Sequence, residues 1–296
     1  MIRIRRRLPR STLVPYLEQN YILSGIPLAY VRDIGFLRAS ERKEITTRKE
    51  SKVRTIYKSK NQSLIQGDAL EVLPRLCRRG EKFHAVITDP PYSSGGLHMS
   101  TRAAATSSKY QSSDAKKKHP DFLGDNRDQR SYLAWSTMWL SYCHELLVDR
   151  GIVCLFSDWR QLPTVSDALQ GAGFIWQGIA SWDKVNARPK LGGFRQQCEF
   201  IVWGSKGKSP GVGTSLPGSF RISLVSGAKR VHAAQKPVEL ISEVCRCTMH
   251  HDEPKILDPF AGSGTTLLAA RSHGIQAVGV EQSPEIAALA VNRLKN

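Results

Sequence analysis

Five short apolar segments of this chain each end in an acidic residue, and no other feature constrains the fold as strongly. The acids are Asp68, Asp89, Asp158, Asp258 and Glu281. Segments with helical periodicity separate the apolar ones, and this alternation predicts a parallel sheet covered by helices on both faces. Because ligands of open α/β sheets bind beyond the carboxyl ends of the strands, the five acids predict a polar cleft at that edge.

The expected elements run from residue 63 to residue 294. We expect strands at 63–68, 85–89, 151–158, 256–258 and 277–281, and an antiparallel pair at 174–182 and 197–203. Helices are expected through Leu70, Leu73 and Leu76, and at 130–147, 161–171, 237–249, 265–273 and 284–294. The pattern predicts a mostly parallel sheet of seven strands. The aromatic residues at 130–147 are expected to pack in the core.

The first motif with chemical content is Asp89, Pro90, Pro91 and Tyr92, which follows the apolar residues 85–88. Proline fixes φ and cannot donate to a sheet ladder, so the strand must end there in a rigid turn. This turn offers a carboxylate, a carbonyl oxygen and an aromatic ring to one point. Two acceptors and one stacking surface suit a planar substrate with an exocyclic amino group. A purely structural Pro-Pro turn is the alternative.

A second motif, at residues 257–266, has the pattern of a strand, a glycine-rich turn and a helix start. Gly262 and Gly264 would let the backbone approach a ligand closely. A dinucleotide fingerprint would need a small residue where Leu267 stands, and a phosphate-binding loop would need a lysine directly after Gly264. The ligand therefore resembles a nucleoside without a pyrophosphate. Glu281, at the next strand end, is placed to accept ribose hydroxyls.

The charge balance favours a polyanionic partner. The 296 residues include 43 Lys and Arg against 26 Asp and Glu, a formal net charge of +17, with an isoelectric point near 9.8. Nucleic acid is the leading candidate, and a membrane surface or simple solubility is the alternative. The predicted DNA-binding residues are Arg188, Lys190, Arg195, Lys206, Lys208, Arg221, Lys229 and Arg230.

Composition predicts a cytosolic globular protein that does not enter a membrane. Hydrophobic residues make up 41% of the chain, and no apolar run approaches the ~20 residues that span a bilayer. The first ten residues are basic but lack the apolar core of a signal peptide. Six cysteines at irregular spacing form no metal-binding pattern and are expected to be free thiols.

Three motifs together resemble the amino-methylating DNA methyltransferases. They are the Asp89–Tyr92 turn, the glycine turn at 260–264, and residues 232–237 with the sequence His-Ala-Ala-Gln-Lys-Pro. The catalytic motif precedes the cofactor turn, which resembles the circularly permuted β class of this family. The resemblance covers roughly 60–206 and 231–296. It implies a Rossmann-like, S-adenosylmethionine-dependent methyltransferase fold with a permuted motif order.

The resemblance also implies roles for single residues. Asp89, Pro90, Pro91 and Tyr92 would be catalytic. The cofactor-binding residues would be Asp68, Ala69, Asp89, Lys236, Asp258, Phe260, Gly262, Ser263, Gly264, Thr265 and Glu281. Within this set, Lys236 and Thr265 would lie near the methionine carboxylate, Glu281 would hold the ribose and Asp68 the adenine edge. A solvated surface lysine is the alternative for Lys236.

The implied reaction is methyl transfer to adenine N6 in double-stranded DNA after base flipping, because the family tends to place Asp first for adenine. Cytosine N4, RNA or protein glutamine as the target, and a non-catalytic DNA-binding role, remain alternatives. We expect short or relaxed sequence specificity, because few Asn, Gln or Glu side chains are available for base contacts near 206–230. A homodimer and a nucleoid-associated location are implied only by the resemblance.

The expected organisation has four parts. Residues 1–50 form a basic arm with short helices, and 51–206 the catalytic part of the methyltransferase domain. This part includes a mobile loop at 93–130, because a long Ser-, Gly- and Lys-rich segment in a compact domain is usually functional or mobile. Residues 207–230 form a short target-recognition region that contacts DNA. Residues 231–296 form the cofactor-binding part of the same domain.

Overall fold

The computed structural model describes residues 53–93, 127–187, 189, 191–209, 211–225 and 235–296. The basic arm at 1–50, most of the 93–130 loop, and Arg188, Lys190, Lys229 and Arg230 lie outside the described residues. The strands are β1 (Arg54–Lys58), β2 (Gln62–Gln66), β3 (Phe83–Thr88), β4 (Leu147–Ser157), β5 (Ile175–Asp183), β6 (Cys198–Ser205), β7 (Ser219–Arg221), β8 (Lys255–Asp258) and β9 (Gln276–Glu281). All nine belong to one sheet.

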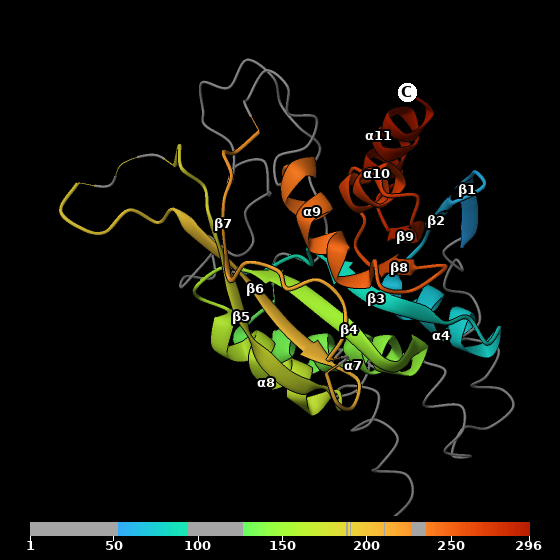
Figure 1. Cartoon of the computed structure of the whole chain (residues 1–296), viewed down its shortest axis with the longest axis horizontal. Coiled ribbons are helices and arrows are strands. Elements are labelled where there is room, and N and C mark those ends of the chain that lie inside the picture. Colours follow the sequence, from blue (N-terminus) through green and yellow to red (C-terminus); the bar gives the residue numbers. More distant parts are fainter. Residues whose placement is uncertain (1–52, 94–126, 188, 190, 210, 226–234) are drawn as a thin grey trace, which may run out of the picture. The chain divides into compact units, whose positions relative to one another are not determined.

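The sheet has the order β1-β2-β9-β8-β3-β4-β6-β5-β7 (Figure 1). Its middle, from β2 to β4, is parallel, whereas β6 runs antiparallel to both β4 and β5. The predicted mixed α/β fold with a mostly parallel sheet is therefore confirmed, as is the antiparallel pair. Parallel strands are covered on both faces, which explains why Ala85, Val86 and Ile87 of the central strand β3 are fully buried.

The described part of the sheet has nine strands, so the prediction of seven was wrong. The two additional strands, β1 and β7, lie at the two edges. An edge strand pairs with one neighbour and leaves much of its surface in water, so it needs no continuous apolar run. In β1, Ile56 and Tyr57 are half-buried and the other three residues are exposed. Strand β7 has three residues, of which only Phe220 is buried, and it lies inside the segment predicted as the target-recognition region.

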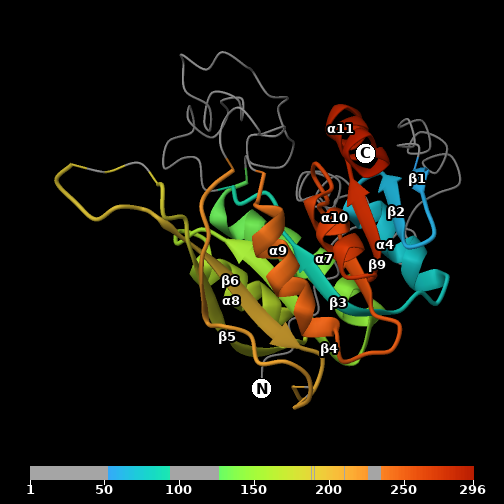
Figure 2. The ribbon, with the colours of Figure 1, turned by 45° about the horizontal axis from the view of Figure 1, so that its top comes forward.

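Six α-helices cover the two faces of the sheet in the described part of the chain (Figures 1 and 2). One face carries α4 (Ala69–Arg78), α7 (Gln129–Leu146) and α8 (Leu162–Gly171), and the other α9 (Val238–Cys245), α10 (Thr265–Ser272) and α11 (Pro284–Lys295). All six were predicted with small shifts in their ends. The predicted helix at 237–249 ends at Cys245 and continues as the 3-10 turn η1 (Arg246–Thr248). No helix among the described residues is long and apolar enough to cross a membrane.

The sheet order brings the two motifs together. Strand β8 pairs with β3, with Val86 opposite Leu257, although the last residues of the two strands, Thr88 and Asp258, are 170 positions apart in the chain. The motifs therefore end side by side at the carboxyl edge of the sheet. There the Thr88 hydroxyl donates a 2.6 Å hydrogen bond to Asp258 Oδ1. This buried bond ties the turn that carries Asp89 to the glycine turn that follows β8.

Candidate active site

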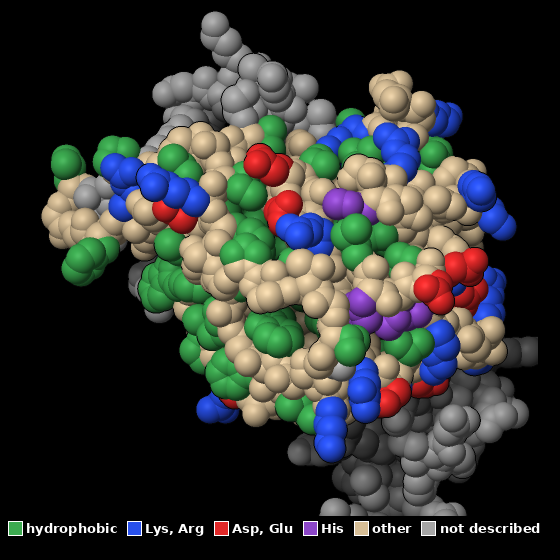
Figure 3. Space-filling view, in the orientation of Figure 1, with side chains coloured by type: hydrophobic (Ala, Val, Ile, Leu, Met, Phe, Trp, Pro, Cys, Tyr) green, Lys and Arg blue, Asp and Glu red, His purple; other side chains and the backbone are tan. Residues whose placement is uncertain are grey.

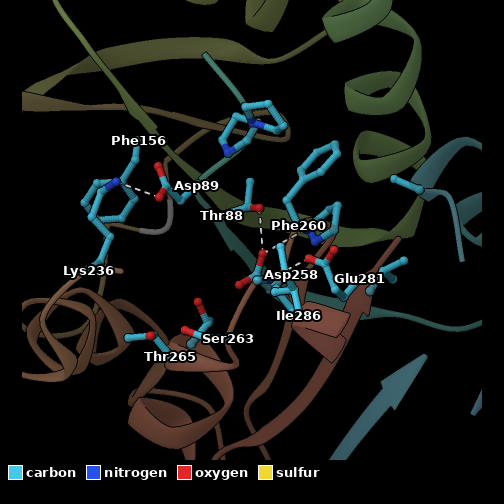
Figure 4. A pocket seen from close by; sticks show the side chains of 18 of the residues that line it. Thr88, Asp89, Phe156, Lys236, Asp258, Phe260, Ser263, Thr265, Glu281 and Ile286 are labelled. Atoms are coloured by element: carbon cyan, nitrogen blue, oxygen red, sulfur yellow. Dashed lines mark hydrogen bonds and ion pairs between the residues drawn. The ribbon is translucent and has the colours of Figure 1, made fainter. Parts of the chain in front are cut away.

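A cavity of about 330 Å³ lies beyond the carboxyl ends of β2, β9, β8 and β3, where the sequence places the polar cleft (Figure 4). Most of the predicted site residues line it. They are Asp68, Ala69, Asp89, Pro90, Pro91, Tyr92, Lys236, Asp258, Phe260, Gly262, Ser263, Thr265 and Glu281. Gly264 and Asp158, which were expected at the cleft, are not among its lining residues.

Asp158 follows β4 as predicted but serves the next helix. Its Oδ1 accepts the backbone N–H groups of Arg160 at 3.1 Å and Gln161 at 3.0 Å. Its Oδ2 lies 3.4 Å from the Arg160 guanidinium. These bonds satisfy amide groups in the turn that leads into α8. The expectation of five acids at the cleft is thus corrected to four.

The Asp89 carboxylate is held from two sides. The Tyr92 hydroxyl donates to its Oδ1 at 2.6 Å, and Lys236 Nζ donates to its Oδ2 at 2.6 Å. Each carboxylate oxygen has two lone pairs, so Asp89 can still accept a hydrogen bond from a bound molecule. Burial raises the pKa of Asp89, and Lys236 only partly offsets that effect. The carboxylate is therefore oriented before any substrate arrives, and it has an increased affinity for a proton.

A buried charge cluster surrounds this carboxylate. Lys236 Nζ lies 3.2 Å from Glu199 Oε2, and Lys184 Nζ lies 3.1 Å from Glu199 Oε1. Burial alone would lower the pKa of Lys236, but Asp89 and Glu199 outweigh burial and raise it. Burial alone would raise the pKa of Glu199, but Lys236 and Lys184 outweigh burial and lower it. Both groups therefore carry their charges at neutral pH.

Lys236 is not a surface lysine, since its side chain is 8% exposed. Its Nζ lies 5.2 Å from the ring centroid of Tyr92 and 5.5 Å from that of Phe156. Glu199 was not predicted. It lies in β6, whose sequence predicts an ordinary strand. The one sequence signal for a site residue is that Glu199 is a charged residue inside an apolar run.

The opposite side of the cavity is built on Asp258 and Glu281 (Figure 4). Asp258 Oδ1 accepts the Phe260 N–H at 3.1 Å in addition to the Thr88 hydroxyl, and burial raises its pKa to about 6. Glu281 accepts the Gly262 N–H at 3.0 Å, and burial raises its pKa to about 7. Asp258 and Glu281 thus both hold the glycine turn through its backbone N–H groups, and Glu281 also accepts the Ser283 N–H at 2.8 Å.

The two glycines of the turn have different roles. Gly262 has a φ of 51° and lines the cavity, so its backbone can contact a ligand. Gly264 has a φ of 79°, and a Cβ there would lie 3.2 Å from the Ala290 Cβ of α11. Gly264 therefore allows α10 and α11 to pack closely.

The start of α10 presents hydroxyl groups to the cavity. Ser263 and Thr265 both line it, and one Arg293 nitrogen donates to their hydroxyls at 2.9 and 3.1 Å. The guanidinium and the helix N-terminus both favour a negative charge at this point. Asp68, on the far side, caps α4 through the Leu70 N–H at 2.8 Å.

Apolar and aromatic side chains form the remaining wall, and the sequence did not identify them as site residues. Trp135, Phe156, Trp182 and Ile286 all line the cavity. The Phe260 ring lies 5.3 Å from the Trp135 ring between centroids. Trp135 was predicted as core with the other aromatics of α7. Each of these residues fits the periodicity of a buried face. The local sequence therefore does not distinguish residues that line the cavity from residues of the core.

The predicted DNA-binding residues within the described part lie at opposite ends of the sheet. Arg195 precedes β6 and Arg221 ends β7, on the same side as the cavity, where Asp183 pairs with Cys198 and Arg221. Lys206 and Lys208 follow the other end of β6, where Ser205 pairs with Ile175. The structure therefore brings Arg195 and Arg221 towards the cavity and separates Lys206 and Lys208 from it.

This architecture is that of an α/β protein with a polar, nucleoside-sized cleft at its strand ends. The chain belongs to the DNA methylase family of the N6/N4 methyltransferase kind, whose profile matches residues 83–220 and 213–292. The protein is therefore a DNA methyltransferase of this family, and both motifs that line the cleft lie within the matched residues.

Curated relatives and solved structures agree with this assignment. The type II methyltransferase M2.MboI of Moraxella bovis is 25% identical over 79% of this chain and 88% of its own length. M2.LlaDCHI of Lactococcus lactis subsp. cremoris is 25% identical over 80% and 91%. The crystal structure of the M1.HpyAVI–SAM complex has a TM-score of 0.58 at 22% identity, covering 79% of this chain and all of that one. PvuII DNA methyltransferase (cytosine-N4-specific) has a TM-score of 0.60 at 17% identity, over 82% and 90%. These structural likenesses establish the fold.

Proposed function

We propose that this protein transfers a methyl group from S-adenosylmethionine to the N6 amine of adenine in double-stranded DNA, after the base has rotated out of the helix. The observation that carries the proposal is the Asp89 carboxylate, which faces the cavity and is oriented by Tyr92 and Lys236. We also assign the chain to the circularly permuted β class, because β3 precedes β8 in the chain although the two strands are neighbours.

The residues of the cavity fit S-adenosylmethionine, which supplies an electrophilic methyl group on a sulfonium. Glu281 has lone pairs for the ribose hydroxyls, and Phe260 and Ile286 offer apolar surface to the adenine. Ser263 and Thr265, backed by Arg293, suit the methionine carboxylate. The ion pairs of Lys236 support a place beside Asp89 rather than at that carboxylate, where the sequence resemblance had put it.

The amine of adenine is a poor nucleophile, because its lone pair is delocalised into the ring. Asp89 and the carbonyl oxygen of Pro90 would each accept one of its N–H groups and orient the lone pair towards the methyl group. As the new N–C bond formed, the sulfonium S–C bond would break and leave a neutral thioether, and the nitrogen would release one proton. Asp89 is placed to take this proton, and its raised pKa favours the transfer.

An adenine paired inside a duplex cannot reach this cavity, so the reaction requires base flipping. The aromatic rings of Tyr92 and Phe156, both at the cavity, provide surfaces for the extruded base. A cytosine presents a similar exocyclic amine, so N4 methylation of cytosine is the second candidate. The first residue of the motif, Asp89 rather than the Ser that the family tends to use for cytosine, favours adenine.

Nucleoside mass spectrometry of duplex DNA, incubated with the protein and isotopically labelled S-adenosylmethionine, tests the proposal. We expect labelled N6-methyladenine. If labelled N4-methylcytosine were found instead, the proposed mechanism would stand, but adenine would be the wrong base. Cofactor binding without any labelled base would refute the proposed reaction on DNA.

Mapping of the methylated positions in the same DNA tests the specificity. We expect a short or relaxed recognition sequence, because the described part of residues 207–225 offers no Asn, Gln or Glu side chain for base contacts. Affinity would then depend mainly on phosphate contacts and fall steeply with salt. A single strict site of five or more base pairs would contradict this expectation.

Cofactor affinity should depend on pH through Glu281. Its folded-state pKa of about 7 lies above the ordinary 4.5. Protonated Glu281 therefore contributes to the free energy of unfolding below pH 4.5, and this contribution is lost as the pH rises through 7. Ribose hydroxyls donate best to the ionised form, so binding should strengthen roughly tenfold from pH 6 to pH 8. Calorimetric titration with S-adenosylmethionine measures this, and Glu281→Gln should flatten the profile. If the affinity for S-adenosylmethionine changed equally with pH in the wild type and in the variant, another group would be responsible for the titration.

A further inference from the structure

The segment that joins β5 to β6 projects from the sheet (yellow in Figures 1 and 2). It starts and ends next to Trp182 and Glu199, which line the cavity. Leu191 and Phe194 near its tip are each 97% exposed, more than any other large hydrophobic residue in the described part of the chain. Gly192, between them, has a φ of 68° and allows a tight turn. Two apolar side chains held in water on one projection have no role in folding, which indicates that they meet a partner.

The base of this projection is firmly connected to the reaction centre. Lys184, directly after β5, pairs with Glu199, which contacts Lys236. The Lys184 N–H also donates to the Gln197 carbonyl at 2.9 Å. Asn186 Oδ1 accepts the Leu224 N–H at 2.9 Å, and Leu224 lines the cavity. An ordered base below an exposed tip is the arrangement expected of a finger that extends from the active site.

The surroundings of the tip are positively charged. Arg195 is exposed next to Phe194, and Arg221, 79% exposed, lies near the base at Asp183. Figure 3 shows basic and hydrophobic side chains together on the projection at the left of the view. Arginine side chains suit phosphates, whereas Leu and Phe suit the apolar stack of bases.

We propose that Leu191 and Phe194 form a wedge that enters the duplex at the target, separates the target base from its stack and fills the space it leaves, while Arg195 contacts a nearby phosphate. This inference rests on the proposed function, because the wedge would serve the base flipping that the proposed reaction requires. Apolar side chains that enter base steps offset the free-energy cost of unstacking the bases.

The test compares methyl transfer to two duplexes of one mapped target sequence. In the first duplex the target adenine faces thymine, and in the second it faces cytosine, so that less energy is needed to extrude it. The variant is Leu191→Ser/Phe194→Ser. Met249→Ser is the matched control, because Met249 is a 51% exposed apolar residue at the other end of the molecule's sheet, next to η1. Thermal unfolding confirms that both variants keep the fold.

We expect the double variant to lose about 10- to 100-fold in rate on the paired duplex, because it can no longer offset the unstacking of the target base. On the mismatched duplex it should retain most of the wild-type rate, and the control should match wild type on both. Equal loss on the two duplexes, or no loss on either, would overturn the wedge. A wild-type protein that methylates neither duplex would instead refute the proposed function.

Discussion

Replacement of Asp89 by alanine should reduce the rate of methyl transfer by about 10²–10³-fold and leave S-adenosylmethionine binding nearly unchanged. Asp89 orients the amine and accepts its proton, and removal of one preorganised group of this kind costs about 10²–10³-fold in rate. The cofactor side of the cavity is built on Asp258 and Glu281, which the substitution leaves in place. The measurements are a single-turnover rate with labelled cofactor and a calorimetric binding constant.

Asp158→Asn is the control for this experiment. Asp158 also follows a strand end, but its carboxylate binds the turn into α8. An asparagine keeps the acceptor, so the rate should match wild type. The Asp89 variant should remain folded, because Lys236 retains its ion pair with Glu199. Transfer within tenfold of wild type in Asp89→Ala would refute the assigned mechanism.

Replacement of Lys236 by methionine should reduce both stability and activity. Lys236 lies between the Asp89 and Glu199 carboxylates, at 2.6 and 3.2 Å, and is almost fully buried. Removing one partner of a buried ion pair leaves uncompensated charge and typically costs about 3–5 kcal/mol in the free energy of unfolding. Chemical denaturation measures that loss.

The catalytic consequence of the same substitution follows from the pKa of Asp89. Lys236 lowers this pKa against the effect of burial. Without Lys236 the carboxyl group should stay protonated to a higher pH and accept the amine less well. The acid limb of the pH–rate profile should therefore move upwards, a change that a merely structural role would not produce.

Two further variants separate the effects of Lys236. Lys184→Met removes the other lysine of Glu199 and should move the pH–rate profile less, because Lys184 is not among the charges that set the Asp89 pKa. Lys236→Met/Glu199→Gln also removes one of the two carboxylates that lose Lys236 as a partner, and it should recover part of the lost stability. If Lys184→Met shifted the profile as much as Lys236→Met, the specific role of Lys236 would be wrong.

Much of the fold follows from local sequence. Two motifs can be recognised from fewer than about ten consecutive residues each. They are the apolar run of β3, which two prolines end, and the glycine turn after β8. Both depend on short-range physics, namely the φ restriction of proline and the conformational freedom of glycine. The alternation of strands and helices then predicts a parallel sheet, and ligands of such sheets bind at the carboxyl ends of the strands.

Other parts of the site required the tertiary structure. Glu199 reaches Lys236 only because β6 runs antiparallel to β4. This direction places the first residues of β6 at the carboxyl edge of the parallel strands. Phe156 and Trp135 have the same apolar spacing as their buried neighbours, so their place at the cavity depends on how α7 and β4 pack. For Asp158 the sequence is misleading. Its position after a strand predicts a site residue, but its carboxylate accepts backbone N–H groups of the turn into α8 and has a structural role.

The sequence by itself therefore determined the fold class, the two motifs and the acids that line the cleft. Only the tertiary structure decided which charges meet at Asp89, which aromatic residues face the cavity and which apolar residues stay in water at Leu191 and Phe194. The physical reason is range. Turn and strand propensities act over a few residues, whereas ion pairs and cavity walls join segments that only the completed sheet brings together.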